Sequence, residues 1–79
     1  MYFVYIVECN DTSLYTGCTN DLKKRIKEHN AGKRGAKYTS MRRPVVLKYK
    51  EKYKTIGKAL SREAEIKRWP KKKKLALFN

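Results

Sequence analysis

Acidic residues are scarce in this chain of 79 residues. Seven Asp and Glu stand against 21 Lys and Arg, which gives a formal net charge of +14. Because the excess runs through the whole chain, an anionic partner is expected. No segment joins a long apolar face to a basic one, and this favours nucleic acid over a membrane surface as that partner.

Cysteine and histidine are scarcer still, with two cysteines and a single histidine. Cys9 and Cys18 together with the distant His29 do not make a zinc site. No signal peptide precedes the first cysteine, because Met1 leads directly into a predicted strand. We therefore expect two free thiols that fill small spaces, in a cytoplasmic protein.

The length predicts one domain over residues 1–79, without repeats, linkers or transmembrane spans. Apolar residues make up 41% of the chain, enough for a core and too many for a disordered basic tail. A domain this small buries only about 60–65% of the surface of its unfolded chain. Polar side chains at core-facing positions therefore need a reason.

Two strands are predicted at the start of the chain. Residues 2–7 are an uncharged run of β-branched and aromatic side chains, which predicts a strand covered on both faces and central in its sheet. Residues 10–13 are turn formers, and residues 14–18 return as a second strand. A two-residue loop would put Tyr5 and Tyr15 on opposite faces of this hairpin, and a three-residue loop would put them on one face. The local sequence leaves this choice open.

A first helix is predicted from Asp21 to Asn30, with Thr19 or Asn20 as its cap. The side chains at its inward spacing are Leu22, Arg25, Ile26 and His29. Two of these four positions are polar, which is unusual for a core-facing stripe. The next segment, residues 31–43, is predicted to be a basic loop that contains glycine.

The second half of the chain predicts a third strand over residues 45–50, with one wet face as at a sheet edge. A second helix is predicted over residues 56–69 behind a Thr55 cap, and a short third helix after it. Glu63 falls on the core-facing line of the second helix, whereas Glu65 lies on its outer side with Arg62 and Arg68.

The polar residues at inward positions form one candidate set: Tyr5, Tyr15, Arg25, His29 and Glu63, with Tyr38 in the basic loop. Phosphodiester hydrolysis requires that a water lose a proton and that charge on the phosphorus and the leaving oxygen be offset. A carboxylate can hold Mg²⁺ with several of its waters, and the planar donors of arginine match phosphoryl oxygens. Tyrosine or histidine can pass the proton. The set therefore predicts chemistry on a phosphodiester.

The order and spacing of these residues resemble the GIY-YIG nuclease superfamily. The triplets Phe3-Val4-Tyr5 and Tyr15-Thr16-Gly17 stand where that superfamily carries its two name motifs. Arg25 and His29 follow at the spacing found there. Three further segments are similar to the compact single-domain bacterial branch, related to the N-terminal domain of the excision-repair incision subunit: residues 35–39, 59–63 and 66–69.

The resemblance implies an α+β domain in which a three-stranded antiparallel sheet is flanked by helices. It implies a metal-dependent endonuclease that hydrolyses DNA, with structure-specific cleavage and DNA repair as the finer expectations. Glu63 would hold one Mg²⁺ or Mn²⁺, and Arg25 would stabilise the transition state. Tyr5 and Tyr15 are both candidates for the base, with His29 beside them.

The resemblance also bears on the substrate. Tyr38 matches a position near the scissile phosphate in relatives. DNA, in preference to RNA, is expected to bind basic residues around the site: Lys33, Arg34, Lys37, Lys71, Lys72, Lys73 and Lys74. Neither an organic cofactor nor a membrane partner is expected, and the sequence points to no particular protein partner.

The chain departs from the family pattern at several positions. Phe3 replaces the glycine of the first motif, Thr16 replaces the isoleucine of the second, and Thr12 stands where the branch often has glycine. Larger relatives add an asparagine after the metal glutamate, and here only Asn79 could serve. Those relatives also carry an appended DNA-recognition domain, so the sequence gives no basis for sequence-specific cleavage.

Each candidate residue also has a structural interpretation. Tyrosines are common at core rims, a histidine near a helix end can bond the last carbonyls, and Glu63 could pair with Arg25 or Lys67. The rival function is a non-catalytic basic nucleic-acid-binding module, either a degenerate nuclease or a ribosome-associated protein. A carboxylate on a core-facing stripe argues against that rival, because it would repel phosphate unless a metal bridged the two.

Overall fold

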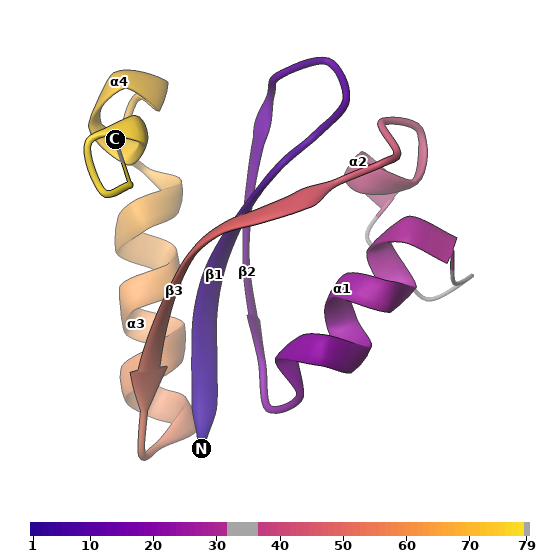
Figure 1. Cartoon of the computed structure of the whole chain (residues 1–79). Helices are drawn as coiled ribbons and strands as arrows, with labels where there is room; N and C mark the ends of the chain where they lie inside the picture. Colours follow the sequence, from indigo (N-terminus) through magenta and orange to yellow (C-terminus); the bar gives the residue numbers. More distant parts are fainter. Residues whose placement is uncertain (32–36, 79) are drawn as a thin grey trace.

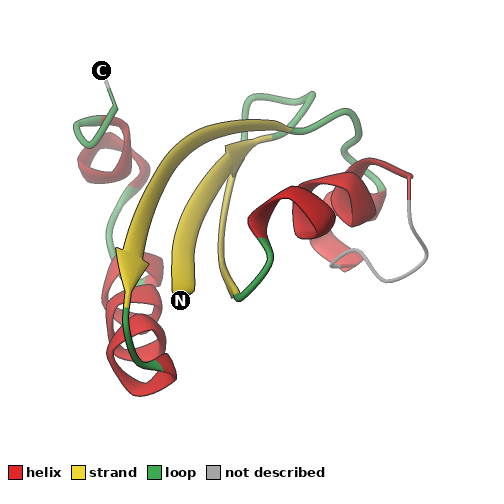
Figure 2. Ribbon diagram, turned by 60° about the horizontal axis from the view of Figure 1, so that its bottom comes forward, coloured by secondary structure: helices red, strands yellow, loops and turns green. Residues whose placement is uncertain are grey.

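The computed structural model describes residues 1–31 and 37–78 (Figure 1). Its centre is an antiparallel sheet in the order β2-β1-β3, made of β1 (Tyr2–Glu8), β2 (Leu14–Thr19) and β3 (Val46–Tyr53). The described helices are α1 (Leu22–Ala31), α2 (Lys37–Ser40), α3 (Ile56–Lys67) and α4 (Lys71–Leu75). Figures 1 and 2 show the sheet between α1 on one side and α3 on the other. The α+β fold implied by the sequence is confirmed.

The central strand is β1, as its uncharged sequence predicts. Residues 4–7 are almost fully buried, because helices cover both faces of this strand. Val4 and Ile6 pack against α3, whereas Tyr5 and Val7 pack in a second cluster on the α1 side. The sheet therefore separates two small cores, and the first motif tyrosine belongs to the α1 side.

The β1–β2 hairpin has the three-residue turn that puts both motif tyrosines on one face. The Cys9 N–H donates to the Ser13 oxygen at 2.8 Å, which leaves three residues in the turn. Tyr15 pairs across the strands with Val7, two residues along β1 from Tyr5. Since side chains alternate along a strand, Tyr5 and Tyr15 share the α1 face.

The edge strand β3 is longer than predicted and contains an irregularity. Its register with β1 shifts between Ile6 and Val7. As a result Leu47 packs in the cluster on the α1 side, whereas Tyr49 packs in the cluster on the α3 side. Simple alternation along a strand would place Leu47 and Tyr49 on the same face, and the bulge places them on opposite faces.

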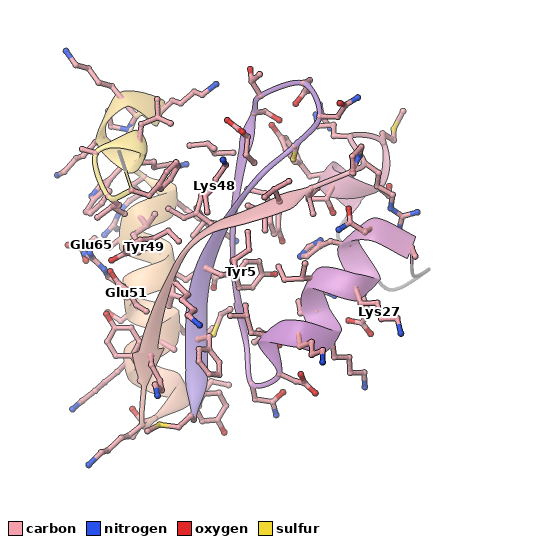
Figure 3. All side chains as sticks on the ribbon, in the orientation of Figure 1. Tyr5, Lys27, Lys48, Tyr49, Glu51 and Glu65 are labelled. Atoms are coloured by element: carbon pink, nitrogen blue, oxygen red, sulfur yellow. The ribbon has the colours of Figure 1, made fainter. Side chains whose placement is uncertain are left out.

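A half-buried carboxylate joins β3 to α3. Glu51 accepts hydrogen bonds from Tyr49, from Tyr53 at 2.6 Å, and from two nitrogens of Arg62 at 3.0 Å (Figure 3). Burial alone would raise its pKa, but these donors lower the pKa of Glu51 to about 2. The prediction that Arg62 lies on the outer side of its helix is wrong, because this pairing draws it over the ring of Trp69.

The first helix begins one residue later than predicted and has a different cap. The Asp21 carboxylate accepts the backbone N–H of Lys24 at 3.1 Å, so Asp21 caps α1, and the prediction of Thr19 or Asn20 is wrong. The Thr19 hydroxyl instead accepts the N–H of Asp21 at 3.1 Å. This local turn at Thr19 precedes the helix, and the Asp21 carboxylate serves as the capping group.

The segment predicted as a basic loop contains a short helix, α2. Arg42 holds it from the C-terminal side by donating to the carbonyl oxygen of Tyr38 at 2.8 Å. Thr39 holds it from the inside through a contact with His29. Propensity does not reveal so short a helix, because tertiary contacts stabilise it.

The second long helix begins at its predicted cap. The Thr55 hydroxyl accepts the N–H of Lys58 at 3.3 Å, and α3 then runs to Lys67, two residues short of the predicted end. The short helix predicted after it is confirmed as α4. Among the described helices, none is long and apolar enough to cross a membrane. Both cysteines are free thiols, as predicted.

Candidate active site

The core of the site is a buried chain of three side chains from three elements. The Tyr5 hydroxyl of β1 lies 2.7 Å from Nε2 of His29 on α1. The Nδ1 atom of His29 lies 2.7 Å from the hydroxyl of Thr39 on α2. All three residues have exposed fractions of 1% or less. Figure 3 shows Tyr5 between the sheet and α1. This chain of three side chains is therefore inaccessible to solvent.

Burial fixes the charge states of two of these groups. Burial, together with the nearby positive charge of Arg25, lowers the pKa of His29 to about 4, so its imidazole is neutral at neutral pH. Burial also raises the pKa of Tyr5 to about 12, although a hydrogen bond from Arg25 opposes the shift. Tyr5 is therefore a protonated phenol at neutral pH.

Gly17, the last residue of the second motif triplet, makes room for Tyr5. A Cβ atom built on Gly17 would lie 2.5 Å from Cζ and 3.0 Å from Cε1 of the Tyr5 ring. Any side chain at position 17 would displace the phenol from His29. This close approach is a physical reason for glycine opposite the first motif tyrosine.

The second motif tyrosine is more open to solvent. The Tyr15 ring packs edge-on against His29, with centroids 5.3 Å apart, and is stacked on Tyr38 at 6.0 Å. The ammonium nitrogen of Lys67 lies 5.9 Å from the centroid of Tyr15. Tyr15 is half-buried and Tyr38 is 40% exposed. Both motif tyrosines therefore contact His29, and Tyr15 is the one that solvent reaches.

A cleft of about 390 Å³ beside the edge strand β2, with a mixed polar and apolar lining, brings Arg25 and Glu63 to one surface. Arg25 donates to Glu28 at 3.3 Å, and its positive charge near Tyr5 opposes the rise in the pKa of that phenol. The Glu63 side chain is 17% exposed and pairs with Lys67 at 3.3 Å. The remaining residues that line the cleft are Tyr2, Cys18, Thr19, Asn20, Ile56 and Leu60.

The donor set of this cleft suits one kind of metal ion. Within residues 1–31 and 37–78, no three acidic, histidine or cysteine side chains gather in a way that could enclose a metal. Glu63 is the carboxylate that lines the cleft. Mg²⁺ commonly binds one or two carboxylates, keeps several waters and takes substrate phosphates as further ligands. The cleft therefore fits Mg²⁺ bound together with a phosphate. Asn79, the other candidate ligand, lies outside the described residues.

A larger hollow of about 590 Å³ lies on the α1 side, between Phe3, Leu22, Ile26 and Leu47. Its walls are mainly apolar, and it contains neither Arg25 nor Glu63. Size alone would favour this hollow as the site. Chemistry favours the smaller cleft, because catalysis on a phosphate requires charged and proton-transferring groups.

The structure gathers most of the residues that the sequence singled out. Two groups adjoin: the aromatic cluster of Tyr5, Tyr15, His29 and Tyr38, and the cleft of Arg25 and Glu63. Sequence reasoning named Lys67 as a possible partner of Glu63, and the ion pair at 3.3 Å confirms it. Sequence reasoning missed Thr39, because no pattern pointed to it.

The predicted nucleic-acid-binding lysines of α4 differ among themselves. Lys71 donates to the carbonyl oxygen of Thr12 at 2.7 Å, and Lys73 lies over the ring of Trp69 at 4.4 Å. Lys72 is exposed, whereas burial and the neighbouring Lys67 lower the pKa of half-buried Lys74. Lys33, Arg34 and the side chain of Lys37 lie outside the described residues.

A basic α+β domain in which a tyrosine pair adjoins a cleft lined by an arginine and a glutamate has the architecture of a nuclease-type domain. The family model of the GIY-YIG catalytic domain matches residues 1–76. UPF0213 proteins of Staphylococcus aureus strains N315 and MW2 are each 55% identical over 77 residues, which cover 98% of this chain and 93% of each relative. The solution NMR structure of a UPF0213 protein from Bacillus halodurans is 42% identical, with a TM-score of 0.61, over 98% of this chain and 82% of that one. The chain belongs to the GIY-YIG family.

Proposed function

We propose that this protein is a Mg²⁺- or Mn²⁺-dependent endonuclease that hydrolyses phosphodiester bonds in DNA. The observation that carries the proposal is the cleft shared by Arg25 and Glu63. If Arg25 and Glu63 had only structural roles, they would not need to face a cleft that solvent can enter. A phosphate-transfer site does need such a cleft, because its substrate must reach it. The adjoining motif tyrosines supply groups that can take or give a proton.

Arg25 is the residue that stabilises charge on the phosphoryl oxygens in this proposal. Its guanidinium always carries a charge, and its planar donors match those oxygens. Glu28 accepts a hydrogen bond from Arg25 at 3.3 Å and holds the guanidinium at the cleft, close to Tyr5. It therefore needs little reorganisation when a phosphate arrives.

Tyr15 is the tyrosine that we assign to the attacking water. A general base must come within hydrogen-bond reach of the proton that it abstracts. Tyr5 is 1% exposed and donates or accepts only within the protein. Tyr15 is half-buried and open to solvent, and the positive charge of Lys67 lies over its ring. Tyr38, stacked on Tyr15, is exposed toward an approaching substrate.

Glu63 is the residue that would hold the metal ion, which would supply Lewis-acid polarisation of the phosphate oxygens. Lys67 is the present partner of this carboxylate, and it would have to release Glu63 when the ion binds. On release, the Lys67 ammonium becomes available to the substrate backbone. Binding of the metal ion and the substrate would thus separate Glu63 from Lys67.

The basic surface supports a DNA substrate without sequence preference. Phosphate contacts from lysine and arginine position a nucleic acid but do not read its bases. The 79-residue chain has a formal net charge of +14. We therefore propose cleavage selected by DNA structure, such as branched or nicked sites, with a role in DNA repair in the cytoplasm.

One observation favours the rival function, a basic binding module without activity. Lys67 already neutralises Glu63 at 3.3 Å, as a structural ion pair would. A divalent-metal titration separates the two functions, because only the nuclease gains activity from the ion. The rival predicts binding that is the same with metal and with chelator, and no cleavage in either.

The test is cleavage of a panel of single-stranded, nicked and branched DNAs, with matching RNAs, in Mg²⁺, Mn²⁺ and chelator. The proposal predicts metal-dependent cleavage of at least one DNA and a large loss of rate in Tyr15→Phe at unchanged affinity. Intact substrates under every condition, bound as tightly as the charge suggests, would replace the nuclease with the binding module.

A further inference from the structure

The buried chain Tyr5–His29–Thr39 determines where its protons must lie. A neutral imidazole has one N–H donor and one acceptor nitrogen, so two tautomers are possible. His29 is neutral at neutral pH because burial disfavours its charged form. Each of its nitrogens has a partner at 2.7 Å, and both partners are hydroxyl groups that can donate or accept. The choice of tautomer therefore depends on the next partner along the chain.

Arg25 supplies that next partner. The Tyr5 oxygen lies 2.7 Å from Nε2 of His29, and the nearby guanidinium of Arg25 opposes the rise in the pKa of Tyr5. A guanidinium has donors only, so it cannot accept the Tyr5 proton. A buried hydroxyl proton without an acceptor is strongly disfavoured, because it loses its hydrogen bond to water without replacement. The acceptor for the Tyr5 proton is therefore Nε2 of His29, and the ring proton must lie on Nδ1.

We propose that Thr39 is a positioning residue that holds His29 as the Nδ1–H tautomer. The Thr39 hydroxyl accepts the Nδ1 proton, and this leaves Nε2 to accept from Tyr5. The Tyr5 oxygen then keeps its lone pairs for Arg25. The donors of Arg25 determine the direction of the Tyr5–His29 hydrogen bond, and the Thr39 hydroxyl supplies the acceptor that the Nδ1 proton then needs.

The buried chain of hydrogen bonds links Thr39, which cannot touch a substrate, to Arg25, which can. Thr39 and His29 are fully buried, whereas Arg25 lines the cleft. Loss of the Thr39 hydroxyl would allow the ring proton to move to Nε2. Tyr5 would then accept from His29, and its own proton would point at a guanidinium that also donates. Arg25 would lose its fixed orientation, while its charge at the cleft would remain.

The tautomer can be measured without any assay of activity. His29 is the single histidine of the chain, so histidine labelled with ¹⁵N gives one ring system in long-range ¹H–¹⁵N spectra. In the wild type at pH 7, a protonated Nδ1 and an unprotonated Nε2 are expected. A proton on Nε2, or one averaged signal for both nitrogens, overturns the proposal. This result holds whether or not the protein cleaves DNA.

Two variants of Thr39 separate the hydroxyl from the shape of the side chain. Thr39→Val keeps the shape and removes the acceptor, so the Nδ1–H preference should be lost. Thr39→Ser keeps a hydroxyl and should retain it. An unchanged spectrum in Thr39→Val would overturn the role of Thr39. If Thr39→Val does not fold, the wild-type and Thr39→Ser spectra still decide the assignment.

The catalytic consequence rests on the proposed function and has its own readout. In single-turnover cleavage, Thr39→Val should lower the rate constant roughly 10- to 100-fold through misplacement of Arg25. The dissociation constant for DNA should stay unchanged, because the charge of Arg25 remains. Thr39→Ser should restore most of the rate. An equal rate in Thr39→Val and wild type would contradict the link to Arg25 and leave the tautomer result standing.

Discussion

Alanine at position 17 would place a methyl group in a steric clash with the ring of Tyr5. The new Cβ would lie 2.5 Å from Cζ and 3.0 Å from Cε1, so the ring must move. Overpacking of this kind costs about 1–3 kcal/mol. Moving the phenol also breaks its bond to His29 and leaves buried polar atoms unpaired, at about 1–3 kcal/mol more. Gly17→Ala should therefore lower the free energy of unfolding by about 2–6 kcal/mol, a large part of the stability of so small a domain.

The measurement is urea unfolding followed by circular dichroism, with Gly57→Ala as the matched control. A Cβ on Gly57 meets nothing within 4 Å, and this glycine lies in α3. Alanine is a better helix former, so Gly57→Ala should stabilise the protein by about 0.5–1 kcal/mol. A loss below about 1 kcal/mol in Gly17→Ala, with the His29 ring signals unchanged, would refute the argument that Tyr5 requires glycine there.

Three further predictions concern stability and binding. The Thr16 hydroxyl is buried without a hydrogen-bond partner in the described part of the chain. Thr16→Val should therefore stabilise the folded protein by about 1 kcal/mol and raise its Tm by roughly 4–8 °C. A lower Tm would mean that the hydroxyl has a partner. Because hydrogen bonds hold the pKa of Glu51 near 2 in the folded state, its stabilising contribution is full above pH 4.5 and is lost as the pH falls toward 2. Glu51→Gln should flatten the stability profile in that window, and a thermal melt series that shows no flattening would contradict the clamp. The logarithm of DNA affinity should fall with the logarithm of salt concentration at a slope of about −0.9 for each phosphate neutralised on duplex DNA. Lys72→Gln should weaken binding to all sequences alike. Equilibrium titrations in which affinity does not change with salt would contradict this prediction.

The sequence predicts the parts of the fold that depend on one element at a time. The uncharged run of β1, the Thr55 cap and the polar positions Arg25 and His29 on a helical stripe all follow from local periodicity. The hairpin register also depends on the length of its turn, which the turn-forming residues 10–13 do not determine by themselves.

The remaining parts of the fold depend on contacts between distant segments. Asn30 is an example, because its amide side chain accepts the N–H of Val45 at 2.6 Å and donates to the Val45 oxygen at 3.0 Å. This pair ties the end of α1 to the start of β3 across fifteen residues. The Glu51 cluster is a second example, since it draws Arg62 inward from a position that helical spacing places outside. No period in the sequence reveals such pairs.

The candidate site shows the same division. Its polar residues are conspicuous in the sequence because they occupy apolar stripes. Which of them solvent reaches is a matter of packing, since α2 covers His29 and Gly17 admits Tyr5. Thr39 carries no signal of its own, because a threonine in a basic loop is unremarkable until the loop folds over a histidine.

The most direct test of the account compares Glu63→Gln with Glu65→Gln in metal-dependent cleavage per folded molecule. Both glutamates lie on α3, but Glu63 lines the cleft, whereas Glu65 is 51% exposed and pairs with Arg62. If Glu63 holds the catalytic metal, Glu63→Gln should abolish cleavage, keep its Tm and bind DNA equally well or more tightly, since a negative charge beside the phosphate is removed. Glu65→Gln should cleave like the wild type, because exposed ion pairs contribute little. Cleavage by Glu63→Gln at the wild-type rate, or a large loss of Tm with the rate per folded molecule unchanged, would make Glu63 structural and contradict the account.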